Sequence, residues 1–247
     1  MKALSLFSGI GGLDEAAEWA GIEVVAMCEI DPFCRAVLCK KWPSMTIFED
    51  VRRLRGSDVG AVDIIFGGYP CQPFSTAGLQ RAEEDPRHLW PEFMRLVREL
   101  RPAWVLGENV DGHVKWGMDT VLQDLDGEGY AARAFVVPAG AVGAFHRRYR
   151  TVLVANAYGN GQQGCEHSLI DSQEWDQAKH AALLPPPARR IPSRDDISSP
   201  RILGTNDGFP DRAYRAMSLG NAAMPQHFFP FFWGIRTIDD MVRRLVA

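Results

Sequence analysis

The 247-residue sequence lacks the features that mark membrane and exported proteins. It has no uncharged apolar run of the roughly 20 residues that a bilayer-spanning helix needs. No charged segment followed by an apolar stretch opens the chain, as a secretory leader would. These absences predict a cytoplasmic protein with no membrane partner.

Cysteine is scarce, and the number and spacing of the cysteines disfavour both a disulfide framework and a zinc site. Five cysteines are present, an odd number, and none forms a C-x-x-C pair or a His/Cys cluster with zinc-finger spacing. They are Cys28, Cys34, Cys39, Cys71 and Cys165. We therefore expect reduced thiols, no disulfide framework and no metal.

The chain also lacks an excess of positive charge. Its 27 Lys and Arg residues against 31 Asp and Glu residues give a net charge of −4, whereas nucleic-acid binders are more often basic. The balance reverses locally, because residues 140–220 hold ten Lys and Arg against eight Asp and Glu. This local excess of positive charge is compatible with a modest, salt-sensitive and non-specific affinity for DNA.

Apolar strand-like runs alternate with helix-like patterns from residue 1 to residue 157. The expected strands are 3–7, 22–30, 45–48, 62–66, 104–106, 130–137 and 151–155. The expected helices are 13–20, one starting at Asp31-Pro32, 91–100 and 120–125. This alternation predicts an α/β fold with a doubly wound, mostly parallel sheet.

Three parts of the chain differ in composition. Residues 1–157 are expected to form the core. Residues 158–203 are polar and irregular, with a triple proline at 185–187, and predict a small irregular lobe. Residues 204–247 regain helical character and many aromatic side chains, which favours a segment that returns to the core.

In doubly wound sheets, ligands bind beyond the carboxyl ends of the strands. The first such end carries Ser8-Gly9-Ile10-Gly11-Gly12, a weak signal because a simple tight turn needs the same residues. Glu29 could accept both ribose hydroxyls of a nucleoside, and Asp50 the exocyclic amine of adenine. Since the turn has no lysine for phosphates, an adenosine ligand without pyrophosphate is favoured, and S-adenosylmethionine fits.

The stretch GGYPCQPFSTAG, residues 67–78, holds Cys71 between two prolines. A free cysteine is often core filler. Here Pro70 and Pro73 stiffen the turn, which favours a positioned thiol. A nucleophilic cysteine needs nearby positive charge or a base, which the arginines of HRRYR, residues 146–150, could supply.

Glu108 follows another expected strand. In a semi-apolar cleft its carboxyl group could protonate or hydrogen-bond a heterocycle nitrogen. A helix-capping acid is the simpler alternative, which the residue type alone leaves open.

Taken in order, these stretches resemble the C5-cytosine DNA methyltransferases. The similar segments are LFSGIGGLDEAAEWAG, CEID, EDV, GGYPCQPFS, DPRHLW, GENV, AGAVGAFHRRYRTVLVANA and SLGNAAMPQ. The resemblance implies a Rossmann-like fold, S-adenosylmethionine as methyl donor with S-adenosylhomocysteine as product, and transfer to C5 of a cytosine in a specific sequence of double-stranded DNA. It also implies a target-recognition role for residues 158–203, a monomer, and a cognate restriction endonuclease as a partner.

The resemblance assigns roles to individual residues. Cys71 would attack C6 of a flipped cytosine, Glu108 would bind its N3 and amino group, and Arg148 and Arg150 would hold its carbonyl and a phosphate. The expected catalytic residues are Cys71, Glu108, Arg148, Arg150, Pro70 and Asn109. The expected cofactor-binding residues are Phe7, Gly9, Gly11, Gly12, Glu29, Ile30, Asp50, Val51, Leu89 and Asn221.

The sequence departs from the family pattern in three places. Phe145-His146 stand where the family has Pro-Gln, which predicts looser aiming of the arginines. The recognition region is only a few tens of residues long. Pro230 and the surrounding FFPFFW stand where the family has a more regular terminal helix, and we expect the aromatic cluster to pack in the core rather than to form a protein-contact patch.

Three other functions are open to the same residues. A relative that acts on RNA is disfavoured because a Cys-Phe-Thr signature before the closing motif is absent. A catalytically weak DNA-binding or regulatory protein is disfavoured by the intact Cys71, Glu108, Arg148 and Arg150. A nicotinamide-dependent oxidoreductase is disfavoured by the G-x-G-G turn.

Overall fold

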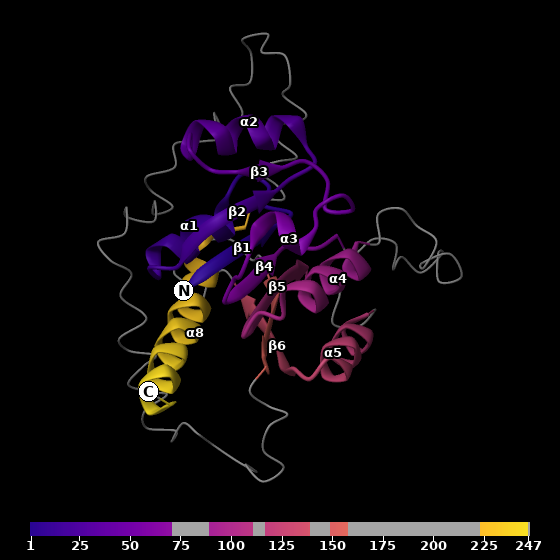
Figure 1. Ribbon diagram of the computed structural model, residues 1–247, viewed down its shortest axis with the longest axis vertical. Helices are drawn as coiled ribbons and strands as arrows, with labels where there is room; N and C mark the ends of the chain where they lie inside the picture. Colours follow the sequence, from indigo (N-terminus) through magenta and orange to yellow (C-terminus); the bar gives the residue numbers. More distant parts are fainter. Residues whose placement is uncertain (71–88, 111–116, 139–148, 158–222, 247) are drawn as a thin grey trace.

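The computed structural model describes residues 1–70, 89–110, 117–138, 149–157 and 223–246 (Figure 1). These residues form a seven-stranded sheet with helices on both faces. The strands are β1 (Lys2–Leu6), β2 (Glu23–Cys28), β3 (Ile47–Phe48), β4 (Ile64–Gly67), β5 (Trp104–Val110), β6 (Ala131–Pro138) and β7 (Tyr149–Asn156). The helices are α1 (Gly12–Trp19), α2 (Pro32–Lys41), α3 (Gly56–Val59), α4 (Trp90–Leu100), α5 (Met118–Gly127) and α8 (Pro225–Val246).

The sheet has the strand order β3-β2-β1-β4-β5-β7-β6. The pairs among β1 to β5 are parallel, and β7 runs antiparallel to both of its neighbours. The prediction of a doubly wound, mostly parallel α/β sheet is therefore confirmed. The chain winds outward from β1 on one side and from β4 on the other, so the topological switch point lies between these two strands.

The core has two layers because side chains alternate along the buried strands. On β4, Ile64 and Phe66 face α1 and α8, whereas Ile65 faces the layer that contains α4 and α5. All three side chains are fully buried. A strand that is buried on both faces reads as the continuous apolar run seen in the sequence.

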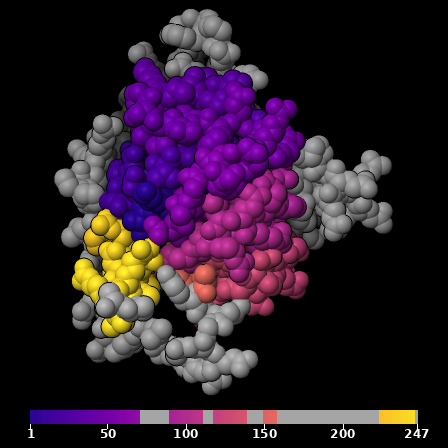
Figure 2. All heavy atoms as spheres, viewed as in Figure 1, coloured from indigo at the N-terminus to yellow at the C-terminus, as the bar shows by residue number. Residues whose placement is uncertain are grey.

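The two ends of the described chain meet on one side of the sheet. In Figure 2 the yellow α8 adjoins the indigo N-terminal segment, and α1 and α8 pack against each other. Nη1 of Arg236 on α8 donates to the carbonyl oxygen of Ala20 at the end of α1, at 2.7 Å. This bond joins residues 216 positions apart and satisfies a carbonyl that the helix end leaves unpaired.

The terminal helix is regular despite the proline, because α8 continues through Pro230 from Pro225 to Val246. A proline inside a helix costs about 3 kcal/mol or more. Burial of Phe228, Phe229 and Phe232, at roughly 1.5–3 kcal/mol each, offsets that cost. The expectation that this aromatic cluster packs in the core is confirmed for these three rings.

Two further boundaries differ from the expectation. β5 extends to Val110 because its carboxyl half pairs with β7, so Glu108 and Asn109 lie within the strand and not after it. The short helix α3 has no apolar period that could predict it. The predicted recognition region, 158–203, lies outside the described residues. None of the described helices is both long and apolar enough to cross a membrane.

Candidate active site

The turn after β1 brings its backbone close to two other segments, one that contains Trp42 and one that contains Ala223. Phe7 has a φ of 54°, in the left-handed region that non-glycine residues seldom adopt. At Gly11, with a φ of 86°, a Cβ atom would lie 2.4 Å from the Trp42 ring. At Gly12 it would lie 2.1 Å from the backbone oxygen of Ala223. Only glycine fits these two positions, so the G-x-G-G spacing serves close packing as well as the turn.

The carboxylate of Glu29 joins the turn after β1 to the segment after β2. Its Oε2 accepts from the backbone N–H of Gly9 at 2.7 Å, and its Oε1 accepts from that of Asp31 at 2.8 Å. The Glu29 side chain is buried. Nη1 of Arg35 donates to the carbonyl oxygens of Glu29 and Ile30 at 3.2 and 2.7 Å. The carboxylate is therefore fixed in place, and each of its oxygens keeps a lone pair for a ligand.

A pocket of about 260 Å³ opens at the switch point between β1 and β4. The described residues that line it are Phe7, Ser8, Gly9, Ile10, Gly12, Leu13, Glu29, Ile30, Asp31, Cys34, Gly68, Pro70, Leu89, Glu108 and Ala223. They include six of the predicted cofactor residues and two of the predicted catalytic ones. None of these described lining residues is lysine or arginine, which suits a ligand without phosphate.

Glu108 reaches this pocket from β5 and forms an ion pair with Arg150 on β7. Nε of Arg150 lies 2.7 Å from Oε1 of Glu108, and both side chains are largely buried. The antiparallel pairing of β5 with β7 aligns Val110 with Arg150 and so sets this pair. A Cβ atom on Gly68 would lie 2.7 Å from Oε2 of Glu108, so the missing side chain leaves room for the carboxylate.

Asn109, beside Glu108, is turned away from the pocket. Its Nδ2 donates to the carbonyl oxygen of Tyr69 at 3.1 Å, and its Oδ1 accepts from the N–H of Val110 at 2.8 Å. The side chain is buried and not among those that line the pocket. Asn109 thus holds the turn that contains Tyr69 and Pro70 against β5.

Asp50 and Val51 lie near the pocket but do not line it. Asp50 borders a second hollow of about 370 Å³, which shares Ile30 with the first. Oδ1 of Asp50 accepts from the backbone N–H and Nε of Arg52 at 3.0 and 2.9 Å. The Arg52 side chain in this way lowers the pKa of the Asp50 carboxyl. Val51 is buried in the core, and Gly11 supports the turn without lining the pocket.

Sequence reasoning missed part of the lining. Cys34 reaches the pocket from the first turn of α2, and Ala223 comes from the segment before α8. Ala223 carries no local signal, because it reaches the pocket from a segment far along the chain, whereas Cys34 follows Glu29, Ile30 and Asp31 within one continuous segment. The predicted residues Cys71, Arg148 and Asn221 lie outside the described residues.

Two described cysteines are poor candidates for a nucleophile. Burial raises the pKa of the Cys28 thiol to about 12, so it stays protonated at neutral pH. Cys39 is exposed on α2 and does not line the pocket. Among the described residues, no group of three or more His, Cys, Asp or Glu side chains is arranged to hold a metal ion.

The sheet and the acid-lined pocket at its switch point define a class, the Rossmann-like methyltransferases. The family model for C-5 cytosine-specific DNA methylase matches residues 1–201. The chain belongs to this family.

Several known proteins are similar to the chain. Type II methyltransferase M2.BsuMI of Bacillus subtilis (strain 168) is 32% identical over 170 residues, which are 64% of this chain and 42% of that protein. M.NgoMIV of Neisseria gonorrhoeae is 33% identical over 165 residues, 64% of this chain and 53% of that protein. The chain therefore spans about half the length of these curated relatives.

Solved structures show the same fold. A candidate DNA modification methyltransferase encoded within a prophage (E. coli) is 30% identical, with a TM-score of 0.55 over 63% of this chain and 46% of that one. Spodoptera frugiperda DNMT2 has a TM-score of 0.57 at 24% identity, over 68% of this chain and 53% of that one. This second likeness concerns the fold alone.

Proposed function

We propose that the protein transfers a methyl group from S-adenosylmethionine to C5 of a cytosine in double-stranded DNA. One observation carries the proposal: a single pocket holds Glu29, suited to a nucleoside, together with Glu108 and Pro70 of the predicted catalytic motifs. A methyl donor and a reacting base must meet within bonding distance, and a shared pocket allows that.

The pocket fits S-adenosylmethionine by its chemistry. Glu29 would accept the ribose hydroxyls, and Phe7, Ile30 and Leu89 give apolar surface for the adenosine. The backbone contact between Gly12 and Ala223 closes one wall. When bound, S-adenosylmethionine supplies an electrophilic methyl group on a sulfonium centre.

Glu108 and Arg150 would prepare the base for attack. Glu108, held by Arg150 at 2.7 Å, would hydrogen-bond N3 and the amino group of the cytosine. Such a bond strengthens as charge develops on the ring, which lowers the barrier. Arg148 and Arg150 are expected to contact the base carbonyl and a nearby phosphate.

Cys71 is the proposed nucleophile, and it follows Pro70 directly in the sequence. Its thiolate would add to C6, which makes C5 a nucleophile. After C5 takes the methyl group, loss of the C5 proton and cleavage of the Sγ–C6 bond would return the thiolate. Because a stacked cytosine shields C6, the base must leave the duplex to enter the pocket.

The relatives are named Type II methyltransferases. We therefore propose a specific DNA sequence as the substrate and a cognate restriction endonuclease as a partner, and we expect a monomer. Residues 158–203 are the proposed recognition region.

A trapping experiment tests the nucleophile. We expect wild-type protein to form a covalent adduct with a duplex that contains 5-fluorocytosine, seen as a band that survives denaturing electrophoresis, because fluorine cannot leave as a proton does. Cys71→Ala should form no adduct and transfer no methyl group. Cys39→Ala, at an exposed site on α2, is the matched control and should behave as wild type.

Bisulfite sequencing of DNA from a methylation-free host that expresses the gene would identify the modified cytosines. Methyl transfer by Cys71→Ala would refute the nucleophile assignment. DNA binding by the wild type without any modified cytosine would instead favour a regulatory relative.

A further inference from the structure

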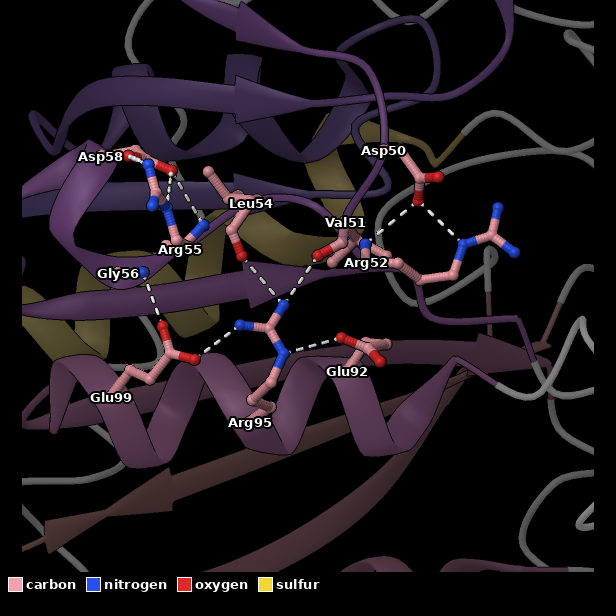
Figure 3. Close-up of polar contacts among 10 residues, drawn as sticks. All are labelled: Asp50, Val51, Arg52, Leu54, Arg55, Gly56, Asp58, Glu92, Arg95 and Glu99. Carbon is pink, nitrogen blue, oxygen red and sulfur yellow. Dashed lines mark hydrogen bonds and ion pairs between the residues drawn. The ribbon is translucent and has the colours of Figure 1, made fainter.

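Arg95 lies in the middle of α4 and points at the segment between β3 and α3 (Figure 3). Its Nη2 donates to two backbone carbonyl oxygens of that segment, Val51 at 2.8 Å and Leu54 at 2.9 Å. One nitrogen therefore contacts the segment at two points three residues apart. Two such bonds from a planar guanidinium fix orientation as well as distance.

Two glutamates on the same helix hold the guanidinium. Nε of Arg95 donates to Glu92 at 2.8 Å, and Nη1 donates to Glu99 at 2.6 Å. The side chains of Arg95, Glu92 and Glu99 are each about two-thirds buried. The second oxygen of Glu99 accepts from the backbone N–H of Gly56 at 2.6 Å. The cluster thus binds three backbone atoms, the carbonyl oxygens of Val51 and Leu54 and the N–H of Gly56 (Figure 3).

Residues 50–56 form the segment that α4 holds in this way. It begins with Asp50 and Val51, which the resemblance assigns to the adenine of the cofactor. Asp50 is turned by its own bonds to Arg52 and borders the hollow that shares Ile30 with the main pocket. No part of Arg95 lines either hollow among the described residues. Among the described residues, Arg95 is connected to this part of the site through its bonds to the backbone of residues 51 and 54.

We propose that Arg95 is a positioning residue for the adenine side of the cofactor site, holding residues 50–56 so that Asp50 can accept the exocyclic amine. The inference rests on the proposed function. It adds to that function a determinant of base selectivity at a residue that lines neither hollow. Arg95 therefore controls how tightly, and how selectively, the nucleoside binds.

Calorimetric titration with two ligands tests the proposal. S-adenosylhomocysteine carries the amine, and S-inosylhomocysteine has an oxygen in its place. We expect the wild type to bind the adenine compound more tightly. Arg95→Ala should weaken its binding by about tenfold and bring the two affinities together, because Asp50 is no longer held in place. At saturating S-adenosylmethionine, kcat should stay within about twofold, so the change appears in KM.

Two further variants sharpen the experiment. Arg95→Lys keeps the charge and the stem but has no planar fork, so it should fall between wild type and Arg95→Ala. Arg98→Ala is the control, because Arg98 lies on the same helix and pairs with Glu128 instead. It should leave both affinities at the wild-type values.

The outcomes distinguish a failure of the role proposed for Arg95 from a failure of the proposed function. Equal loss of affinity for both compounds in Arg95→Ala, or unchanged selectivity together with a lower melting temperature, would show a structural role only and overturn the inference. If Arg95→Ala does not fold, wild-type selectivity in Arg95→Lys would overturn it equally. Failure of the wild-type protein to bind either compound would refute the proposed function itself.

Discussion

Adjacent side chains on β5 meet different surroundings because side-chain direction alternates along a strand. Glu108 lines the pocket and pairs with Arg150, whereas Asn109 is buried against the Tyr69 carbonyl. In this Glu-Asn pair, the charged side chain of Glu108 faces the pocket, whereas the neutral side chain of Asn109 holds the neighbouring turn in place. A resemblance at the level of a motif does not separate these roles, and the hydrogen bonds do.

Gly68 gives a prediction at the residue scale. Its backbone φ lies outside the left-handed region, so alanine fits the chain, but a Cβ atom would lie 2.7 Å from Oε2 of Glu108. Gly68→Ala should therefore displace the carboxylate and lower kcat by roughly tenfold or more, with the free energy of unfolding little changed. Steady-state methylation assays with a denaturant titration measure both quantities.

Gly127→Ala is the matched control, since a Cβ atom there meets nothing within 4 Å. It should keep wild-type kcat. Full activity of Gly68→Ala would mean that the position of Glu108 does not limit the rate.

Helix α8 shows how burial decides the shape of an element. Propensity predicts a break at Pro230, yet the helix continues because the rings on both sides of the proline pack on the sheet and on α1. Phe232 is fully buried, and its ring meets that of Phe66 edge to face, with centroids 4.9 Å apart.

Truncation of this ring is the prediction at the element scale. Phe232→Ala removes a fully buried side chain and leaves a cavity beside β4, so it should lower the free energy of unfolding by about 3–5 kcal/mol. Urea unfolding followed by circular dichroism measures the change. Met241→Ala, on the exposed side of the same helix, should cost much less. Similar losses in both variants would contradict the assigned packing.

Local sequence patterns predict most of the order of helices and strands, but they do not predict where each element ends. The run Val62–Phe66 identifies β4, because a central parallel strand is apolar on both faces. The length of β5 follows from pairing with β7, some forty residues later, and no local pattern encodes such a contact. The site divides in the same way: Glu29 could be predicted from its place at a strand end, but Ala223 and Arg95 act through segments far from it in the sequence.

For the whole molecule, a buried acid links stability to pH. Asp14, in the first turn of α1, is fully buried, and burial raises the pKa of its carboxyl from 3.8 to about 7. Between these values the folded protein keeps a proton that the unfolded chain has released. The free energy of unfolding therefore falls as the pH rises from about 4 to about 7, and this loss is constant above that range.

Replacement of this acid should change the pH dependence. Asp14→Asn cannot ionise, so its stability relative to wild type should be greater at pH 8 than at pH 5, by roughly 2 to 3 kcal/mol. Urea unfolding at the two pH values measures the difference. Glu15→Gln, which removes only a surface ion pair with Lys41, is the control and should show little pH dependence. A constant offset for Asp14→Asn would show that the carboxyl does not titrate in this range.

The contact between Gly12 and Ala223 has a thermodynamic consequence. Ala223 belongs to the segment that leads into α8, so the pocket is complete only while that helix is docked. A ligand that binds only the docked form must stabilise docking, by about 2.7 kcal/mol at a concentration one hundred times Kd. Local opening of α8 then becomes about one hundred times rarer when the pocket is filled. Occupancy is thus coupled to the order of a helix that lies outside the lining of the pocket.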